Sequence, residues 1–262
     1  MRAVRRRRLL LASPVFIGFL LFYIVPFGFS VYYSVIESAF SEEFVGWKNY
    51  ADALSNPYFR LAVRNALEII VAFVPALVGV ALLLAVLVRR AGERHWLLRA
   101  FLLMPMLLPS AAVANVFGML RLGSARWPVF LLFLWKNSGF LMVLLMAGTS
   151  VIPKELYEAA SVDGASRVRQ FFAITIPQLL STLFFCVVLA VVYALRIFKE
   201  AFLLYGAYPT DEIYLVQHYL NNYFAKLNYP GLTAGSMLFS AILFEAILLA
   251  LRLERRMGGD VG

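Results

Sequence analysis

The chain has 262 residues, of which 62% are hydrophobic and 15% are charged. A soluble globular protein has roughly 45–50% apolar and roughly 25% charged residues, so this composition excludes an ordinary soluble enzyme and a disordered chain, and the single cysteine, Cys186, excludes a disulfide scaffold. The net charge of +9 is concentrated at the edges of apolar runs, a pattern typical of membrane proteins rather than of nucleic-acid binding.

Six apolar runs are long enough to cross the ~30 Å hydrocarbon core of a bilayer, which takes ~20 helical residues. Internal prolines do not exclude these spans, because neighbouring helices and water satisfy the freed backbone groups in a membrane bundle. The fold class that we predict is an all-α membrane protein, a six-transmembrane-helix bundle that forms one domain over residues 1–262. The predicted spans cover residues 9–35, 65–88, 97–120, 128–151, 178–198 and 232–251.

Basic residues indicate how the chain is oriented, because lysine and arginine favour cytoplasmic loops. They cluster before the first run, between the second and third runs, and after the sixth, which all lie on one side if the chain crosses six times. The loop over residues 36–61 is more acidic, and only a short turn with Arg121 and Arg126 opposes the pattern. Both termini are therefore predicted to be cytoplasmic. The residues of the three clusters are Arg2, Arg5, Arg6, Arg7, Arg8, Arg89, Arg90, Arg94, Arg99, Arg252, Arg255 and Arg256.

Residues 152–177, between the fourth and fifth spans, read as two short helices at an angle. Pro153 suits the first turn of a helix, where its missing N–H costs nothing. Gly164 predicts a stop or a sharp bend, since glycine reaches positive φ freely. Asp163 or Ser166 can then cap a second helix.

One face of this segment is formed by small residues beside a negative edge, made by Glu158 and Asp163. Small side chains let another backbone approach closely, and the carboxylates would suit a basic protein surface. The residues alone leave two readings open, a docking site for a protein and an amphipathic helix that rests on lipid. The small residues are Ala159, Ala160, Gly164 and Ala165.

The same segment resembles a known family. The string of Glu158, Ala159 and Ala160, followed by Asp163, Gly164 and Ala165 and then by Phe171, Ile174 and Pro177, is similar to the EAA loop in the membrane subunits of bacterial ABC importers. Gly46-Trp47-Lys48-Asn49-Tyr50 and other stretches resemble the carbohydrate-uptake branch, the sugar permeases of the MalF/UgpA type. The resemblance covers nearly the whole chain.

The resemblance implies a permease subunit that imports a carbohydrate in an ATP-driven, binding-protein-dependent system in the bacterial cytoplasmic membrane. The EAA loop would be a coupling helix that sits in a cleft of an ATPase subunit. The implied partners are a second permease subunit in a heterodimer, two ATPase subunits and an extracytoplasmic solute-binding protein. The chain has no P-loop motif, so we expect no cofactor on it, no enzymatic activity of its own, and ATP and Mg on the partner ATPases.

Two stretches depart from the family pattern. The turn at about 121–127 is shorter than in most relatives, and residues 204–212 replace a glycine-rich, threonine-containing stretch. Both could alter how a binding protein docks.

Polar residues inside membrane spans are costly and mark functional sites by default. By the resemblance, the fourth and fifth spans line the translocation cavity, and aromatic, amide and charged side chains suit a sugar. The candidates for the substrate cavity are Lys136, Asn137, Phe140, Tyr193 and Glu200.

These candidates also have structural readings. Lys136 can extend its charge toward the interface, Tyr193 can face lipid, and Arg196 and Glu200 can form an i,i+4 pair.

Other charged residues have structural expectations. Arg64 and Glu68 are spaced to pair near the membrane interface. Glu245 in the sixth span can pair across a subunit interface or mark a solvated cavity, and we favour a structural role for it. The two histidines, His95 and His218, stand far apart, so we predict no metal site.

Three alternative functions compete with a carbohydrate importer. A secondary transporter would carry inverted repeats and broken midplane helices, and a membrane enzyme would carry a nucleophile, a metal cluster or paired carboxylates. We find neither set of features. The residues do not exclude an importer of amino acids or peptides instead of carbohydrate.

Overall fold

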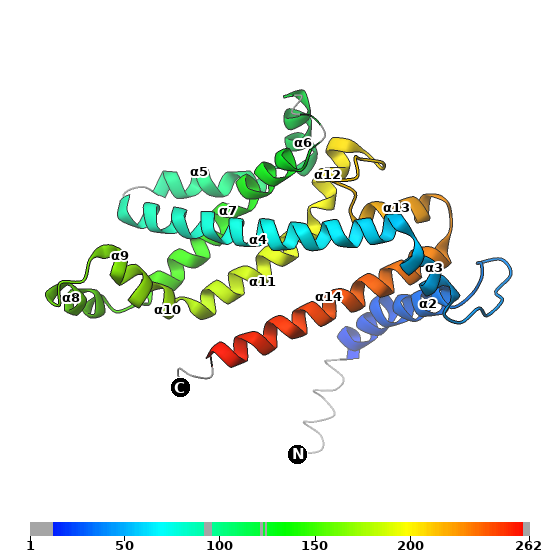
Figure 1. Ribbon diagram of the computed structural model, residues 1–262, viewed down its shortest axis with the longest axis horizontal. Helices are drawn as coiled ribbons and strands as arrows, with labels where there is room; N and C mark the ends of the chain where they lie inside the picture. Colours follow the sequence, from blue (N-terminus) through cyan, green and yellow to red (C-terminus); the bar gives the residue numbers. More distant parts are fainter. Residues whose placement is uncertain (1–12, 92–95, 121–122, 124, 259–262) are drawn as a thin grey trace, which may run out of the picture. The chain divides into compact units, whose positions relative to one another are not determined.

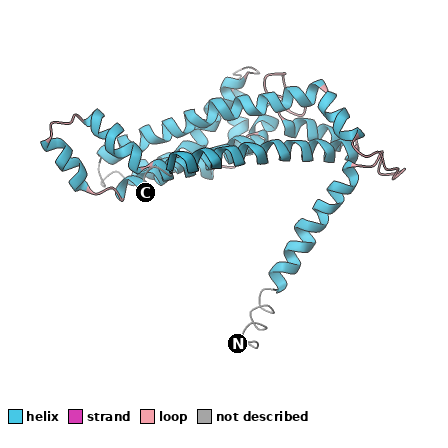
Figure 2. Ribbon diagram, turned by 60° about the horizontal axis from the view of Figure 1, so that its bottom comes forward, coloured by secondary structure: helices cyan, strands magenta, loops and turns pink. Residues whose placement is uncertain are grey.

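The computed structural model describes residues 13–91, 96–120, 123 and 125–258. Within these residues all regular secondary structure is helical, apart from one isolated bridge between Ile36 and Phe44 (Figure 2). This confirms the predicted all-α class. The basic residues predicted before the first span, residues 9–12 of that span, and Arg94 and Arg121 lie outside the described residues.

The helices follow one another along the part of the chain that the structure describes (Figure 1). Their bounds are η1 (Leu20–Ile24), α2 (Val25–Ser34), α3 (Lys48–Ser55), α4 (Pro57–Ala91), α5 (Trp96–Leu107), α6 (Ser110–Met119), α7 (Arg126–Ser150), α8 (Lys154–Val162), α9 (Arg167–Gln170), η3 (Phe171–Thr175), α10 (Ile176–Gln178), α11 (Leu180–Arg196), α12 (Phe198–Tyr205), α13 (Val216–Ala225) and α14 (Tyr229–Gly258).

Five helical stretches among the described residues are long and apolar enough to cross a membrane. They match five of the six predicted spans. Their bounds are Ser13–Ser34, Pro57–Arg89, Arg126–Ser150, Leu180–Tyr205 and Tyr229–Leu248.

The predicted third span, over residues 97–120, is two helices and not one. α5 and α6 meet at a bend of 91°. Pro109 causes the break, because a proline disfavours the helical conformation of the residue before it, here Leu108, and α6 begins only at Ser110. The pair counts as a sixth span only if a bent helix pair crosses the membrane.

The chain forms two compact units, each described here by itself. The first comprises Met1–Val63 with Val216–Gly262, and the second comprises Arg64–Leu215. The sequence suggested one domain, and the second unit contains all the predicted substrate and EAA residues.

The core of the second unit lies between α4, α7 and α11. Leu77 and Ala81 of α4, Leu141 and Leu145 of α7, and Cys186 of α11 are fully buried in it. Cys186 therefore packs as a small hydrophobic residue, as predicted. Three long helices held by an apolar core give the polar groups between them fixed positions.

Gly139 sets how closely α5 and α7 approach. A Cβ atom at this position would overlap the backbone carbonyl of Leu102. We expect Gly139→Ala to lower the free energy of unfolding by about 1–3 kcal/mol, the usual cost of overpacking. Gly79→Ala in α4 is the control, since a Cβ there meets nothing within 4 Å, and it should leave thermal unfolding in detergent unchanged or raised. Equal midpoints for Gly139→Ala and wild type would contradict the close approach.

The first unit packs α14 against α2, α3 and α13. Phe59 and Tyr219 meet edge to face with ring centroids 5.2 Å apart. His218 on α13 is fully buried, and this burial lowers its pKa to about 4 because charge is disfavoured away from water.

The buried His218 is expected to make this protein sensitive to acid. Its pKa in the folded state lies below the ordinary value of 6.5, so the unfolded chain binds the proton more readily as pH falls from about 6.5 to about 4, and stability is lost in that window. At about pH 5 the loss is about 2 kcal/mol. Thermal unfolding in detergent at about pH 7.5 and about pH 5 should show a drop for wild type and a smaller drop for His218→Gln. Equal drops would contradict the assignment.

Glu245 is exposed on α14. It forms no ion pair with another described residue. Its pairing across a subunit interface stays a prediction.

Candidate functional site

The segment between α7 and α11 contains the two short helices that the sequence predicts (Figure 1). α8 follows Pro153 and carries Glu155 in its first turn, where a carboxylate is favoured by the helix dipole. The helix ends in a Schellman motif: the Ala165 N–H donates to the Ala160 carbonyl at 2.9 Å, and the Gly164 N–H donates to the Ser161 carbonyl at 3.1 Å. Gly164 has φ +76°, so the predicted glycine bend is present.

Ser166 caps the second helix. Its hydroxyl accepts a hydrogen bond from the Arg169 N–H at 3.3 Å. Of the two caps that the sequence allowed, Asp163 instead stands at the C-terminal end of α8. α9 ends at Gln170 and continues directly into the π-turn η3.

Three side-chain hydrogen bonds hold α8 against the chain that follows it. The Gln170 amide donates to the Ser161 hydroxyl at 2.9 Å and to the Ala165 carbonyl at 3.1 Å. The Tyr157 and Thr175 hydroxyls are 2.9 Å apart. These contacts were not foreseen from the sequence, because they join residues that no local pattern connects. They join α8, α9 and η3 into one continuous element over Lys154–Thr175, which we call the EAA element.

The predicted EAA residues lie on the surface of this element. Glu158, Ala159, Asp163 and Gly164 are exposed, and Ala160 and Ala165 are half-buried. Val162 beside them is 89% exposed. The surface of α8 and of the turn after it therefore carries two carboxylates, small residues and an exposed apolar side chain.

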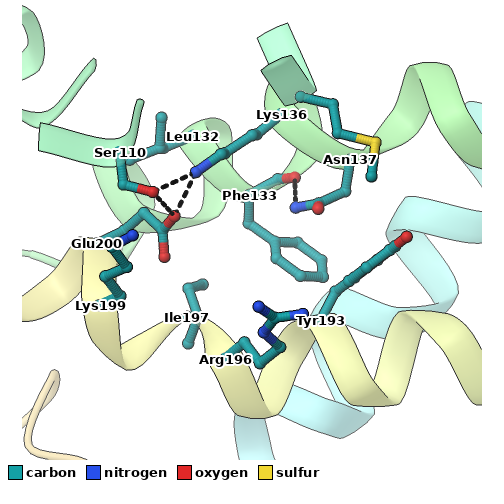
Figure 3. A pocket seen from close by; sticks show the side chains of 11 residues that line it. Ser110, Leu132, Phe133, Lys136, Asn137, Tyr193, Arg196, Ile197, Lys199 and Glu200 are labelled. Atoms are coloured by element: carbon teal, nitrogen blue, oxygen red, sulfur yellow. Dashed lines mark hydrogen bonds and ion pairs between the residues drawn. The ribbon is translucent and has the colours of Figure 1, made fainter. Parts of the chain in front are cut away.

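A cavity of about 200 Å³ lies in the second unit, between α5, α6, α7, α11 and α12. Lys136 and Asn137 of α7, Tyr193 of α11 and Glu200 of α12 line it (Figure 3). Four of the five predicted substrate residues thus meet in one cavity. Phe140 instead packs against the hydrophobic core and does not line the cavity.

The cavity is closed on one side by a polar triangle. The Lys136 ammonium donates to the Glu200 carboxylate at 2.6 Å and to the Ser110 hydroxyl at 2.5 Å, and Ser110 donates to Glu200 at 2.9 Å (Figure 3). The Lys136 and Glu200 side chains are only 14% and 13% exposed. Such a charge pair is costly to break, since each partner would be left buried without compensation.

This triangle corrects two structural readings of the sequence. Lys136 turns inward to Glu200 and does not extend its charge toward the interface. The i,i+4 pair of Arg196 and Glu200 does not form, and the Glu200 carboxylate pairs with Lys136 instead. Ser110 escaped the sequence analysis, because a serine in an apolar run carries no signal of its own.

Asn137 and Tyr193 stand on facing helices of the cavity (Figure 3). The Asn137 amide donates to the Phe133 carbonyl at 2.8 Å, which leaves its carbonyl oxygen as an acceptor. Tyr193 is half-buried and lines the cavity, so it does not face lipid alone. A cavity with an aromatic ring, an amide and an ion pair can bind a molecule with both apolar faces and hydroxyl groups.

A second polar network ties the start of α4 to the start of α7. Arg64 and Glu68 form the predicted pair at 2.7 Å. The Arg126 guanidinium adds unforeseen contacts, donating to the Glu68 carboxylate at 2.5 Å and to the side-chain oxygen Oδ1 of Asn65 at 2.5 Å. The Asn65 amide in turn donates to the Tyr214 carbonyl at 2.8 Å. The network anchors the loop that follows α12.

Comparison with known proteins identifies relatives over most of the chain. Residues 78–259 match the model of the family "Binding-protein-dependent transport system inner membrane component". The sulfoquinovosyl glycerol transport system permease protein SmoG of Agrobacterium fabrum is 28% identical, over 92% of this chain and 88% of that relative. The probable ABC transporter permease protein YesP of Bacillus subtilis is 30% identical, over 90% of this chain and 87% of that relative.

A solved structure has the same fold. A chain in the crystal structure of a bacterial ABC transporter involved in the import of the acidic polysaccharide alginate superposes with a TM-score of 0.83, at 20% identity, over 97% of this chain and 98% of that chain.

Proposed function

We infer, from the fact that this chain belongs to the family of inner membrane components of binding-protein-dependent transport systems, that it is the permease subunit of an ATP-driven importer of a carbohydrate. Members of the family are transport components, so the chain is a multi-pass membrane transport subunit and not an enzyme. The observation that carries the inference is the combination of an exposed EAA element with a polar cavity formed by the helices on either side of it.

Carbohydrate is the cargo that the relatives and the cavity both support. SmoG is named for sulfoquinovosyl glycerol, and the structural neighbour belongs to an alginate importer. The cavity offers what a sugar needs: the Tyr193 ring for C–H faces, and Lys136, Asn137 and Glu200 for hydroxyl groups. Its volume of about 200 Å³ is below the ~300–1,000 Å³ of drug-sized sites, so the cavity would hold one sugar unit of a longer saccharide.

The EAA element is proposed to be the coupling helix. α8 presents Ala159 and Glu158 to solvent, and these suit close approach by a basic cleft of an ATPase subunit. ATP and Mg²⁺ would bind the ATPase partners, whose closure would push α8.

The connectivity of the second unit suggests how that push reaches the cavity. α7 carries Lys136 and ends at Ser150, just before α8, whereas α11 starts just after α10 and leads to Glu200 on α12. Lys136 is about 20 Å along the helix from Ser150, at 1.5 Å per residue. A movement of the coupling element therefore acts on both helices that hold the ion pair. This is a bistable element that nucleotide and cargo can bias in opposite directions.

The partners follow from the same proposal. The five or six spans among the described residues do not enclose a pathway by themselves, so a second permease subunit completes it as a heterodimer. Two ATPase subunits bind on the cytoplasmic side, where the EAA element and both termini lie. A solute-binding protein docks on the opposite side, near the loop anchored by Asn65 and Arg126.

Co-purification tests the proposal. Tagged full-length protein is isolated in mild detergent, and the accompanying chains are identified by mass spectrometry. We expect an ATPase and a second permease with its own EAA loop to co-purify with the chain. A solute-binding protein should be recovered in addition when the complex is cross-linked before isolation. Isolation of the chain alone, together with sodium- or proton-driven uptake in vesicles, would contradict it.

A further inference from the structure

The cavity holds more positive charge than its ion pair uses. Its lining includes Lys136, Arg196 and Lys199 as cations and Glu200 as the one carboxylate. Since Lys136 and Glu200 compensate each other at 2.6 Å, two positive charges remain on the same cavity wall.

Arg196 and Lys199 are not neutralised by another part of the described chain. Neither takes part in any ion pair among the described residues, and both are exposed. They lie three residues apart around the turn between α11 and α12, with Arg196 beside Tyr193 (Figure 3). Cations at the edge of an apolar span need a counter-charge or contact with water, so a cavity that carries two of them favours an anionic occupant.

We propose, on the basis of the carbohydrate-import function argued above, that the cavity binds an acidic carbohydrate. Arg196 and Lys199 bind its anionic group, whether carboxylate, sulfonate or phosphate. The planar guanidinium of Arg196 matches the two oxygens of such a group. The Tyr193 ring contacts the sugar face, and the triangle of Ser110, Lys136 and Glu200 borders the hydroxyl groups.

A neutral sugar fits this arrangement less well. It would leave both cations without a counter-charge once the cavity closes and water is expelled, at a cost that an anionic sugar avoids. Lys136 does not fill this role, because Glu200 already holds it. The two uncompensated cations thus favour acidic over neutral carbohydrates. The aromatic and amide groups alone do not distinguish the two.

Binding of two matched disaccharides tests the proposal. The complete complex of this chain with its co-purifying permease and ATPases is placed in phosphatidylcholine nanodiscs, without binding protein. Labelled cellobiose is compared with cellobiouronic acid, in which one hydroxymethyl group is oxidised to a carboxylate, by equilibrium dialysis. We expect the acid to bind roughly tenfold tighter, and the preference to fall between about 50 mM and about 500 mM salt.

Charge-neutral variants assign the preference to the two cations. In Arg196→Gln/Lys199→Gln the preference should fall to about twofold or less, because the acid loses its counter-charges while cellobiose binding becomes equal to or tighter than in wild type. Retained cellobiose binding shows that the cavity is intact. Arg196→Lys should keep part of the preference. Lys226→Gln is the matched control, since Lys226 is exposed and does not line the cavity.

Three results would overturn the proposal. They are equal or tighter binding of cellobiose, no binding of either disaccharide, and a preference that survives in the double variant, which would assign the two cations to lipid headgroups. The import function would stand in each case as long as the ATPase and the second permease co-purify. Failure of the complex to form would instead remove the function on which the proposal rests.

Discussion

Replacing Gly164 by proline is expected to abolish uptake while ATP hydrolysis continues. Gly164 has φ +76°, whereas proline is fixed near −65°. Proline also removes the N–H that donates to the Ser161 carbonyl at 3.1 Å. The Schellman motif that ends α8 is then lost, and the angle between α8 and α9 changes. The complex should hydrolyse ATP at a rate close to wild type, with uptake of the binding protein's solute reduced by roughly tenfold or more.

Asparagine at the same position is the matched control. It tolerates the left-handed conformation better than other non-glycine residues, so Gly164→Asn should keep most of the uptake. Normal uptake by Gly164→Pro would contradict the coupling role of the element. Loss of the protein from the membrane would be visible as a lower yield of the assembled complex, which is measured in parallel.

Breaking the Lys136–Glu200 pair is expected to have the second large effect. The two side chains are 14% and 13% exposed and 2.6 Å apart, and removing one partner of a buried pair costs about 3–5 kcal/mol. Because both retain some exposure, we expect Glu200→Gln to lower the free energy of unfolding by about 3 kcal/mol. Thermal unfolding in detergent measures this loss, and uptake should fall as well.

The double variant Lys136→Met/Glu200→Gln separates stability from transport. With both charges removed, no unpaired charge remains in the cavity, so stability should return toward wild type. Uptake should stay low, because the groups proposed to border the cargo are gone. If the stability loss of the double variant equals the sum of the losses of the two single variants, the two residues do not form a direct pair. Wild-type uptake by the double variant would contradict a place for the pair in the transport pathway.

Features determined by neighbouring residues could be predicted from the sequence. The two helices of the EAA element follow from Pro153, Gly164 and Ser166, each of which acts within one helical turn. The Arg64–Glu68 pair follows from spacing within one uninterrupted helix. Five of the six spans follow from apolar length alone, which the bilayer requires.

Features that depend on a break in a helix or on a residue distant in the sequence could not be predicted. Pro75 and Pro105 lie inside α4 and α5 without ending them, whereas Pro109 separates α5 from α6 by 91°, and residue type does not distinguish the three. Glu200 contacts Lys136 and Ser110, which lie far from it in the sequence. Such distant contacts build the cavity, which explains why its residues could be named singly but not paired.

Site-specific cross-linking from the coupling element tests the central claim most directly. Cysteine is placed at Ala159, which is exposed, in a Cys186→Ala background, and a photoactivatable maleimide is attached in the native membrane. We expect a cross-link to the ATPase subunit that changes when a non-hydrolysable ATP analogue is added. Phe40→Cys, which is 94% exposed in the loop predicted to lie on the opposite side, should give no such product. Cross-links to lipid alone from position 159 would contradict the account, because the element would then rest on the membrane.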